Sequence, residues 1–150
     1  MSKYRVLQLT NAAVGAVDTN GFMPFGIITR RISCGANCGT ESTFTVSTTG
    51  ANIIYLNEAG YYKITYSATL AAGAAGAVTS ALIANGVSVS SASETTAAVG
   101  NNVNLTIVFM VRVLPNCDSV PNNAPISIQV QNTGVAVTGG NSNLLIERVY

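Results

Sequence analysis

The stretch Gly60-Tyr61-Tyr62-Lys63-Ile64-Thr65-Tyr66 decides the fold of this chain. After the opening glycine, aromatic and β-branched side chains recur at every second position, which places Tyr62, Ile64 and Tyr66 on one face. This alternation is typical of a β-strand that buries one face. Tyr61 and Tyr62 cannot both point inward, because successive side chains of a strand point to opposite faces. The stretch therefore predicts a half-buried strand over residues 61–70.

The rest of the chain shows similar short alternations and no long amphipathic helix. Asn85-Gly86 lies between two apolar runs and predicts a β-hairpin, since both residues tolerate the positive φ of a type I′ turn. Many short strands separated by turn signals predict an all-β, antiparallel two-sheet sandwich or a barrel, and a jelly roll fits this length. Strands are expected at residues 4–9, 22–32, 44–47, 53–56, 61–70, 81–84, 87–89, 105–114, 126–131, 135–137 and 144–149.

The most hydrophobic of these segments is residues 105–114. One face carries Leu105, Ile107, Phe109, Val111 and Val113. The other face carries Val108 and Met110 and is also apolar. A strand that is apolar on both faces is typically buried on both sides, and this is what we expect here.

The composition indicates a single domain that associates with other chains. Apolar residues make up 48% of the chain and charged residues 9%, against roughly 25% charged residues in ordinary soluble domains. So little charge favours a surface that is partly covered by other chains. We expect residues 22–150 to form the domain and residues 1–21 to be an N-terminal arm or a first strand, which could attach the domain to a carrier.

Several partners and activities are not expected. The few basic residues are scattered, which does not favour nucleic-acid binding, and no run approaches the roughly 20 apolar residues of a membrane helix. There is no histidine, so one chain cannot build a Ser-His-Asp triad. The glycine-rich stretches lack the lysine of a phosphate-binding loop. We expect no enzyme activity, no cofactor and no metal; the oxygen-bearing loop at residues 116–123 is interpreted as a turn rather than a calcium site.

The three cysteines are Cys34, Cys38 and Cys117. Cys34 and Cys38 frame a short turn that could hold a local disulfide, and Cys117 could instead pair with either of them. A zinc site would need a fourth ligand. The cysteines are therefore candidates for a structural disulfide or for structural thiols.

Four motifs carry a family resemblance. Gly60, Tyr62 and Ile64 follow a glycine-x-tyrosine-x-phenylalanine pattern, with isoleucine in place of phenylalanine. Three further motifs follow in order along the chain. They are an Asn-Gly hairpin at residues 84–87, a Gly-Asn turn at residues 99–103 with Asn101 in place of aspartate, and a glycine-rich turn with a closing strand at residues 139–146. From about Phe22 to the end, the chain resembles the C1q/TNF-like superfamily of trimeric jelly rolls. Within it, the chain is similar to C-terminal domains of bacterial spore-surface collagen-like glycoproteins and to phage head or tail fibre proteins.

The resemblance implies a homotrimer whose axis is apolar and lined by aromatic residues. The candidates for its trimer core or interface are Tyr62, Ile64, Tyr66, Phe109 and Val111. We expect the chain to be a capsid decoration or head-fibre protein on a phage virion surface. The alternative is a protein of the bacterial spore or cell surface, which is less favoured because no Gly-X-Y stalk precedes the domain.

Attachment to the particle is expected to use the N-terminal segment, with Lys3, Tyr4 and Arg5 as candidate residues. The expected partners are further copies of the chain and other virion or particle-surface proteins. An alternative function is adhesion to a host glycan or receptor through loops such as residues 116–123.

Overall fold

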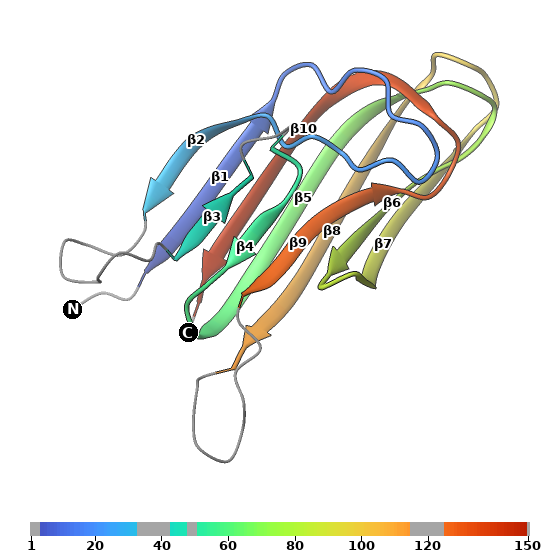
Figure 1. The fold of residues 1–150 in the computed structure, drawn as a ribbon. Helices are drawn as coiled ribbons and strands as arrows, with labels where there is room; N and C mark the ends of the chain where they lie inside the picture. Colours follow the sequence, from blue (N-terminus) through green and yellow to red (C-terminus); the bar gives the residue numbers. More distant parts are fainter. Residues whose placement is uncertain (1–3, 33–42, 48–50, 115–124, 150) are drawn as a thin grey trace.

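A computed structural model describes residues 4–32, 43–47, 51–114 and 125–149. Within these residues the chain forms two antiparallel sheets of five strands each, packed face to face (Figure 1). Sheet A has the strand order β2 (Ile27–Ile32), β1 (Arg5–Asn11), β10 (Val137–Arg148), β5 (Gly60–Ala72) and β8 (Asn102–Val113). Sheet B has the order β3 (Phe44–Val46), β4 (Ile54–Leu56), β9 (Ile126–Asn132), β6 (Gly76–Ala84) and β7 (Val87–Thr96). The prediction of an all-β two-sheet sandwich is confirmed.

The stretch that decides the fold lies in β5, between β10 and β8. Tyr62 and Tyr66 point toward sheet B and are fully buried. Tyr62 meets the ring of Phe44 edge to face, with 6.0 Å between the ring centroids, and Tyr66 meets Phe25 in the same way at 6.3 Å. Such pairs add about 0.5–1.5 kcal/mol each beyond the burial of apolar area. The two tyrosines therefore join sheet A to sheet B and to the segment before β2.

Burial favours the neutral form of both phenols. Burial raises the pKa of Tyr66 and of Tyr62, because a phenolate would lose its hydration. The nearby Glu58 carboxylate raises the pKa of Tyr62 further, whereas Arg148 and Arg5 lower it by less. The neutral Tyr62 hydroxyl donates a hydrogen bond to the Glu58 carbonyl oxygen at 2.5 Å. Tyr62 is thus held at its polar end as well as by its ring.

The strand β8 corrects one prediction. Its inward face is buried as expected at Leu105, Ile107 and Val111. On the opposite face, the exposed fractions of Val108 and Met110 are 54% and 48%. The expectation of burial on both sides is wrong for the single chain, because among the described residues no further layer covers the outer face of sheet A.

The N-terminal residues are part of the sandwich. Residues 5–11 form β1, which lies between β2 and β10. The chain then crosses from sheet A to sheet B, bridging Val17 to Val137 and Phe22 to Gln131 (Figure 1). Regular pairing with β1 begins only at Ile27, so the strand expected at residues 22–32 is shorter than predicted.

A glycine pair lies near the start of β10, beside an irregularity in its pairing with β5. The register of β10 against β5 shifts between Val137 and Gly139. Gly140 has a φ of 136°, and a Cβ added there would lie 2.0 Å from the Thr69 carbonyl oxygen. A Cβ at Gly139 would have no neighbour within 4 Å. Only glycine fits at Gly140, where the backbones of β10 and β5 approach closely.

One carboxylate links the two chain ends of the domain. Glu58, just before β5, accepts a hydrogen bond from Arg148 Nη1 at 2.9 Å, and its other oxygen lies 3.5 Å from Arg5 Nε. Thr43 Oγ1 donates to the same carboxylate at 2.8 Å, and Arg148 Nη2 donates to the Ala59 carbonyl oxygen at 2.6 Å. Glu58 therefore holds the start of β1 and the end of β10 against the turn that precedes β5.

We expect Gly140→Ala to lower the free energy of unfolding by about 2–4 kcal/mol, through positive-φ strain and the backbone clash. Gly139→Ala is the matched control, and its effect is expected to stay within about 0.5 kcal/mol. Urea unfolding at one protein concentration measures both variants. Equal effects of the two variants would contradict the close approach at Gly140.

We expect Glu58→Gln to lower the free energy of unfolding by about 1–3 kcal/mol, because it leaves two mostly buried arginines without their counterion. The range is modest because 33% of the Glu58 side chain is exposed and solvent screens part of the attraction. The exposed Asp18→Asn is the matched control, with an expected change within about 0.5 kcal/mol. Thermal unfolding of both proteins at low and high salt tests this account, which fails if Glu58→Gln is as stable as the unmodified chain.

Candidate functional site

The outer face of sheet A, which points away from sheet B, carries the candidate functional surface. The strand register arranges its side chains in rows across β8, β5 and β10. Near the two chain ends lies a row formed by Met110, Lys63 and Glu147, and toward the opposite end lies a row formed by Thr106, Ser67 and Asn143. We call these two regions the proximal half and the distal groove. The first is apolar and charged, whereas the second is neutral and polar.

The proximal half presents large apolar side chains to solvent. Val108 and Met110 are about half exposed, and Tyr61 is 36% exposed. The Arg112 guanidinium carbon lies 5.3 Å from the centroid of the Tyr61 ring, a cation–π geometry that orders the ring at the surface. In the strands of sheet B that the structure describes, Val87 is the one large apolar side chain with comparable exposure. The exposed apolar surface is therefore concentrated on sheet A.

The opposite edge of sheet A carries a second apolar cluster. All six residues of β2 are exposed, and the exposed fractions of Ile27, Ile28 and Ile32 are 72%, 41% and 37%. Lone edge strands with such side chains tend to pair with other chains and are usually protected in soluble proteins. The β2 edge and the β8 edge are thus two different apolar surfaces at the two ends of one sheet.

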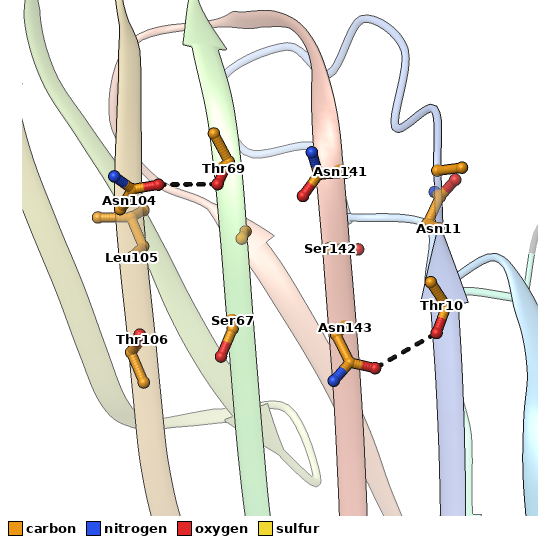
Figure 2. Close-up of a pocket in the computed structure, with 12 residues that line it drawn as sticks. Thr10, Asn11, Ser67, Thr69, Asn104, Leu105, Thr106, Asn141, Ser142 and Asn143 are labelled. Atoms are coloured by element: carbon orange, nitrogen blue, oxygen red, sulfur yellow. Dashed lines mark hydrogen bonds between the residues drawn. The ribbon is translucent and has the colours of Figure 1, made fainter.

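The distal groove is a hollow of about 350 Å³ on the same face (Figure 2). Thr69 Oγ1 donates to Asn104 Oδ1 at 2.7 Å, and Thr10 Oγ1 donates to Asn143 Oδ1 at 3.4 Å. Gln8 Nε2 donates to the same Asn143 oxygen at 3.2 Å. The groove is lined by Thr10, Asn11, Ala12, Ser67, Ala68, Thr69, Asn104, Leu105, Thr106, Asn141, Ser142 and Asn143, none of which is charged.

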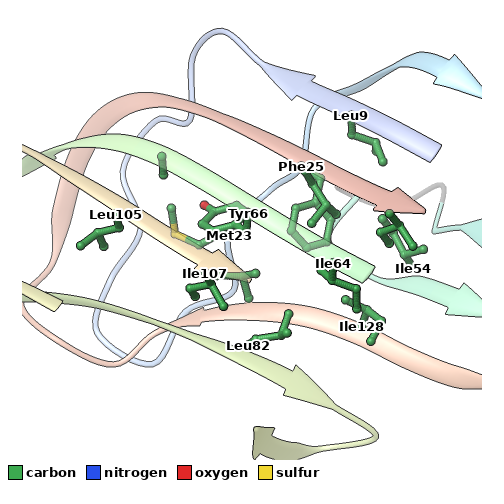
Figure 3. Close-up of a cluster of buried hydrophobic side chains, with 14 of the residues drawn as sticks. Leu9, Met23, Phe25, Ile54, Ile64, Tyr66, Leu82, Leu105, Ile107 and Ile128 are labelled. Atoms are coloured by element: carbon green, nitrogen blue, oxygen red, sulfur yellow. The ribbon is translucent and has the colours of Figure 1, made fainter. Parts of the chain in front are cut away.

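The structure places the predicted trimer residues inside a single subunit. Tyr62, Ile64, Tyr66 and Val111 are buried in the core between the two sheets, and Phe109 is partly buried against the same core. Figure 3 shows Ile64 and Tyr66 within this cluster. The outward surface belongs to their sequence neighbours on the same strands. Alternation could have identified those neighbours, since residues next to an inward position point outward.

The other predicted site residues are dispersed. Tyr4 is 41% exposed, whereas the Arg5 side chain is largely buried in its contact with Glu58. Lys3, Cys34, Cys38 and Cys117 lie outside the described residues, as does the loop at residues 116–123. The disulfide candidates and the attachment candidates stay predictions.

The described residues bring no three Cys, Asp or Glu side chains close enough to hold a metal ion. In the same part of the chain, no helix is long and apolar enough to cross a membrane.

No protein-family model and no curated protein sequence matches the chain. Solved structures do resemble it over nearly its full length. Eiger TNF from S. frugiperda superposes with a TM-score of 0.68 at 8% identity, covering 98% of this chain and 92% of that one. The globular domain of zebrafish complement 1qA gives a TM-score of 0.60 at 8% identity, covering 97% and 98%. PRD1 vertex protein P5 gives 0.58 at 16% identity, covering 97% of each chain.

At these identities the likeness establishes the fold and not the role. None of the three names describes an enzyme. The chain has the C1q/TNF-like jelly-roll fold that its motifs predict.

Proposed function

We propose that the chain is a non-enzymatic structural module that forms a homotrimer on a particle surface. The observation that carries this proposal is the exposed apolar surface of sheet A at β8 and β2. Subunits that pack head to tail around a closed ring need two different complementary surfaces on each copy. The two edges of sheet A are such a pair. Val108 and Met110 of one subunit would pack against the β2 region of the next.

The composition supports the same assembly. With 9% charged residues, the free chain has little charge to oppose association, and its apolar edges are poorly suited to permanent exposure. Buried tyrosines hold each subunit together from within, so the contact between subunits can use the outward side chains of the same strands. Folding of the subunit and assembly of the trimer are therefore served by opposite faces of sheet A.

A virion surface is the location that we propose. The fold is shared with a vertex protein of the phage PRD1, which supports a role at the surface of a viral particle. Both described chain ends, Tyr4 and Val149, lie at the end of the sandwich opposite the distal groove (Figure 1). We propose that Lys3 and Tyr4 contact the particle at that end. Arg5 serves the Glu58 contact instead.

We expect Met110→Asp to convert the trimer into folded monomers, because three carboxylates would have to be buried against apolar neighbours. Light scattering gives the mass, and circular dichroism checks that the β fold is retained. Val87→Asp, which introduces the same charge on sheet B, is the matched control and should remain trimeric. A folded Met110→Asp protein of unchanged trimeric mass would contradict the proposed contact.

We expect the double variant Lys3→Ala/Tyr4→Ala to remain trimeric and to bind particles less tightly. The measurement is co-sedimentation with particles of the virus that encodes the chain, together with immunogold labelling of those particles. Unmodified protein that never labels particles would overturn the proposed location. Full particle binding by the double variant would overturn the role of the N-terminal end.

A further inference from the structure

We propose that the outer face of sheet B carries a binding platform for a neutral oligosaccharide. This face points away from sheet A, and the proposed contact between subunits does not use it, because that contact joins the two edges of sheet A. We call this surface the β9 platform and define it by Phe22, Tyr55, Asn85, Gln129 and Gln131. Its binding role goes beyond the proposed function and does not depend on the trimer.

The orientation of β9 decides which side chains reach this face. Ile128 and Val130 are fully buried between the sheets, so Ser127, Gln129 and Gln131 point outward. The strand β4 adjoins β9 on one side and β6 adjoins it on the other (Figure 1). The three outward side chains therefore form the centre line of the outer face of sheet B.

Two aromatic rings flank this line on its β4 side. Tyr55 pairs with Ser127, and Phe22 bridges to Gln131. Because β6 occupies the other side of Gln131, Phe22 lies on the same side of β9 as Tyr55. Residues opposite each other in an antiparallel pair share a face, so both rings point outward, and Phe22 is 39% exposed. Ser127 and Gln131 are four residues apart along β9, which separates the two rings by about 13 Å.

The β6 side of the line is covered by carboxamide side chains. Ala81 and Ile83 stand opposite Gln131 and Gln129 and share their outward face. The exposed fractions of Ala81 and Ile83 are nevertheless only 3% and 7%, and neither belongs to the core cluster between the sheets. Neighbouring side chains therefore lie over them, and the two glutamines are the long side chains directly opposite. Gln131 is held in place because its Nε2 donates to the Asn20 carbonyl oxygen at 3.0 Å.

The platform offers polar groups that the fold leaves unused. Asn85 Oδ1 accepts a hydrogen bond from the Ser127 backbone nitrogen at 2.8 Å, which fixes the carboxamide and leaves Asn85 Nδ2 to donate to a ligand. Within the described part of the chain, the Gln129 carboxamide and the Tyr55 hydroxyl make no hydrogen bond. Groups that are already oriented lose little side-chain entropy when a ligand binds.

This combination of groups selects a sugar chain as the ligand. Aromatic faces can stack on the C–H groups of a sugar ring, and carboxamides donate and accept hydrogen bonds as sugar hydroxyl groups do. Two rings about 13 Å apart fit an oligosaccharide better than a single sugar. A protein partner would favour a contiguous apolar centre, whereas the rings here are separated by polar side chains.

The charge of the face selects a neutral ligand. Glu94 is the one charged residue in the five strands of sheet B, and its carboxylate accepts a hydrogen bond from the Asn104 backbone nitrogen of sheet A at 3.0 Å. The strands of sheet B thus provide no cation to compensate a sialic acid, a sulfate or a phosphate. Asp18, in the segment that leads to Phe22, is also acidic. Anionic ligands would lose hydration without gaining a counterion and are disfavoured.

The platform remains accessible in the proposed assembly. Sheet A faces the neighbouring subunits in that arrangement, so sheet B of each subunit faces away from the centre of the trimer. Three platforms on one trimer would raise the apparent affinity for a surface that displays many copies of a glycan.

The test is a glycan array probed with the full chain, with neutral hexose and N-acetylhexosamine oligosaccharides in one arm and sialylated or sulfated ones in the other. We expect binding in the neutral arm. Calorimetric titration then compares the neutral oligosaccharide that gives the strongest signal with its constituent monosaccharide. The oligosaccharide should bind at least about tenfold more tightly, because only the longer ligand reaches both rings.

Variants of the platform locate the site. Phe22→Ala, Tyr55→Ala and Gln129→Ala should each weaken binding about threefold to tenfold. Val99→Ala shortens a 66% exposed side chain outside the platform, and Thr95→Val removes an exposed hydroxyl elsewhere on sheet B, so both controls should bind as the unmodified chain does. Circular dichroism checks the fold of every variant, and the surface substitution Gln129→Ala decides if a ring variant does not fold.

The proposal is overturned by an absence of binding in the neutral arm, by a preference for the anionic arm, by equal affinity for monosaccharide and oligosaccharide, or by full affinity in the folded platform variants. Light scattering separates this proposal from the proposed trimer. A monomeric chain that binds neutral oligosaccharides through the platform would support the site and contradict the trimer. Loss of trimeric mass in the platform variants would show that this face is a subunit contact and would overturn the carbohydrate site.

Discussion

The pairing of β5 with β10 on one side and β8 on the other is the constraint on which the rest of the structure depends. This pairing extends along almost the whole length of β5 and fixes the register of the three strands. Because side chains alternate between faces, the register assigns Tyr62, Ile64 and Tyr66 to the core and Tyr61, Lys63 and Thr65 to the outer face. A shift by one residue would exchange the two sets, so the core and the outer surface are determined together.

The outer face is in turn divided along its length. In the proximal half the rows carry Val108, Met110 and Tyr61, whereas the rows of the distal groove carry hydroxyl and carboxamide side chains. The apolar rows are suited to contact with another copy, whereas the rows of the distal groove are neutral and polar. The glycine at Gly140 belongs to the same arrangement, since it lets β10 approach β5 closely beside the groove.

The sequence predicts the sandwich well because its main signals are local. Alternation around Tyr62 and the Asn85-Gly86 turn depend on nearest neighbours, and both occur where they are expected. The outer surface was harder to predict because it depends on the position of a strand within its sheet. Val108 and Met110 suggest burial from their sequence, and only the two-sheet arrangement, which places them on the outer face of sheet A, shows that they are exposed. The groove combines residues from β1, β5, β8 and β10, whose proximity follows from topology and from no single motif.

The most direct test of the account is the mass of the unmodified chain in solution, determined by sedimentation equilibrium over a wide range of concentrations. The account predicts a single species of three times the chain mass of 15.4 kDa, which persists on dilution. A species of 15.4 kDa throughout the range would contradict the account, since the apolar edges of sheet A would then remain exposed in a stable monomer.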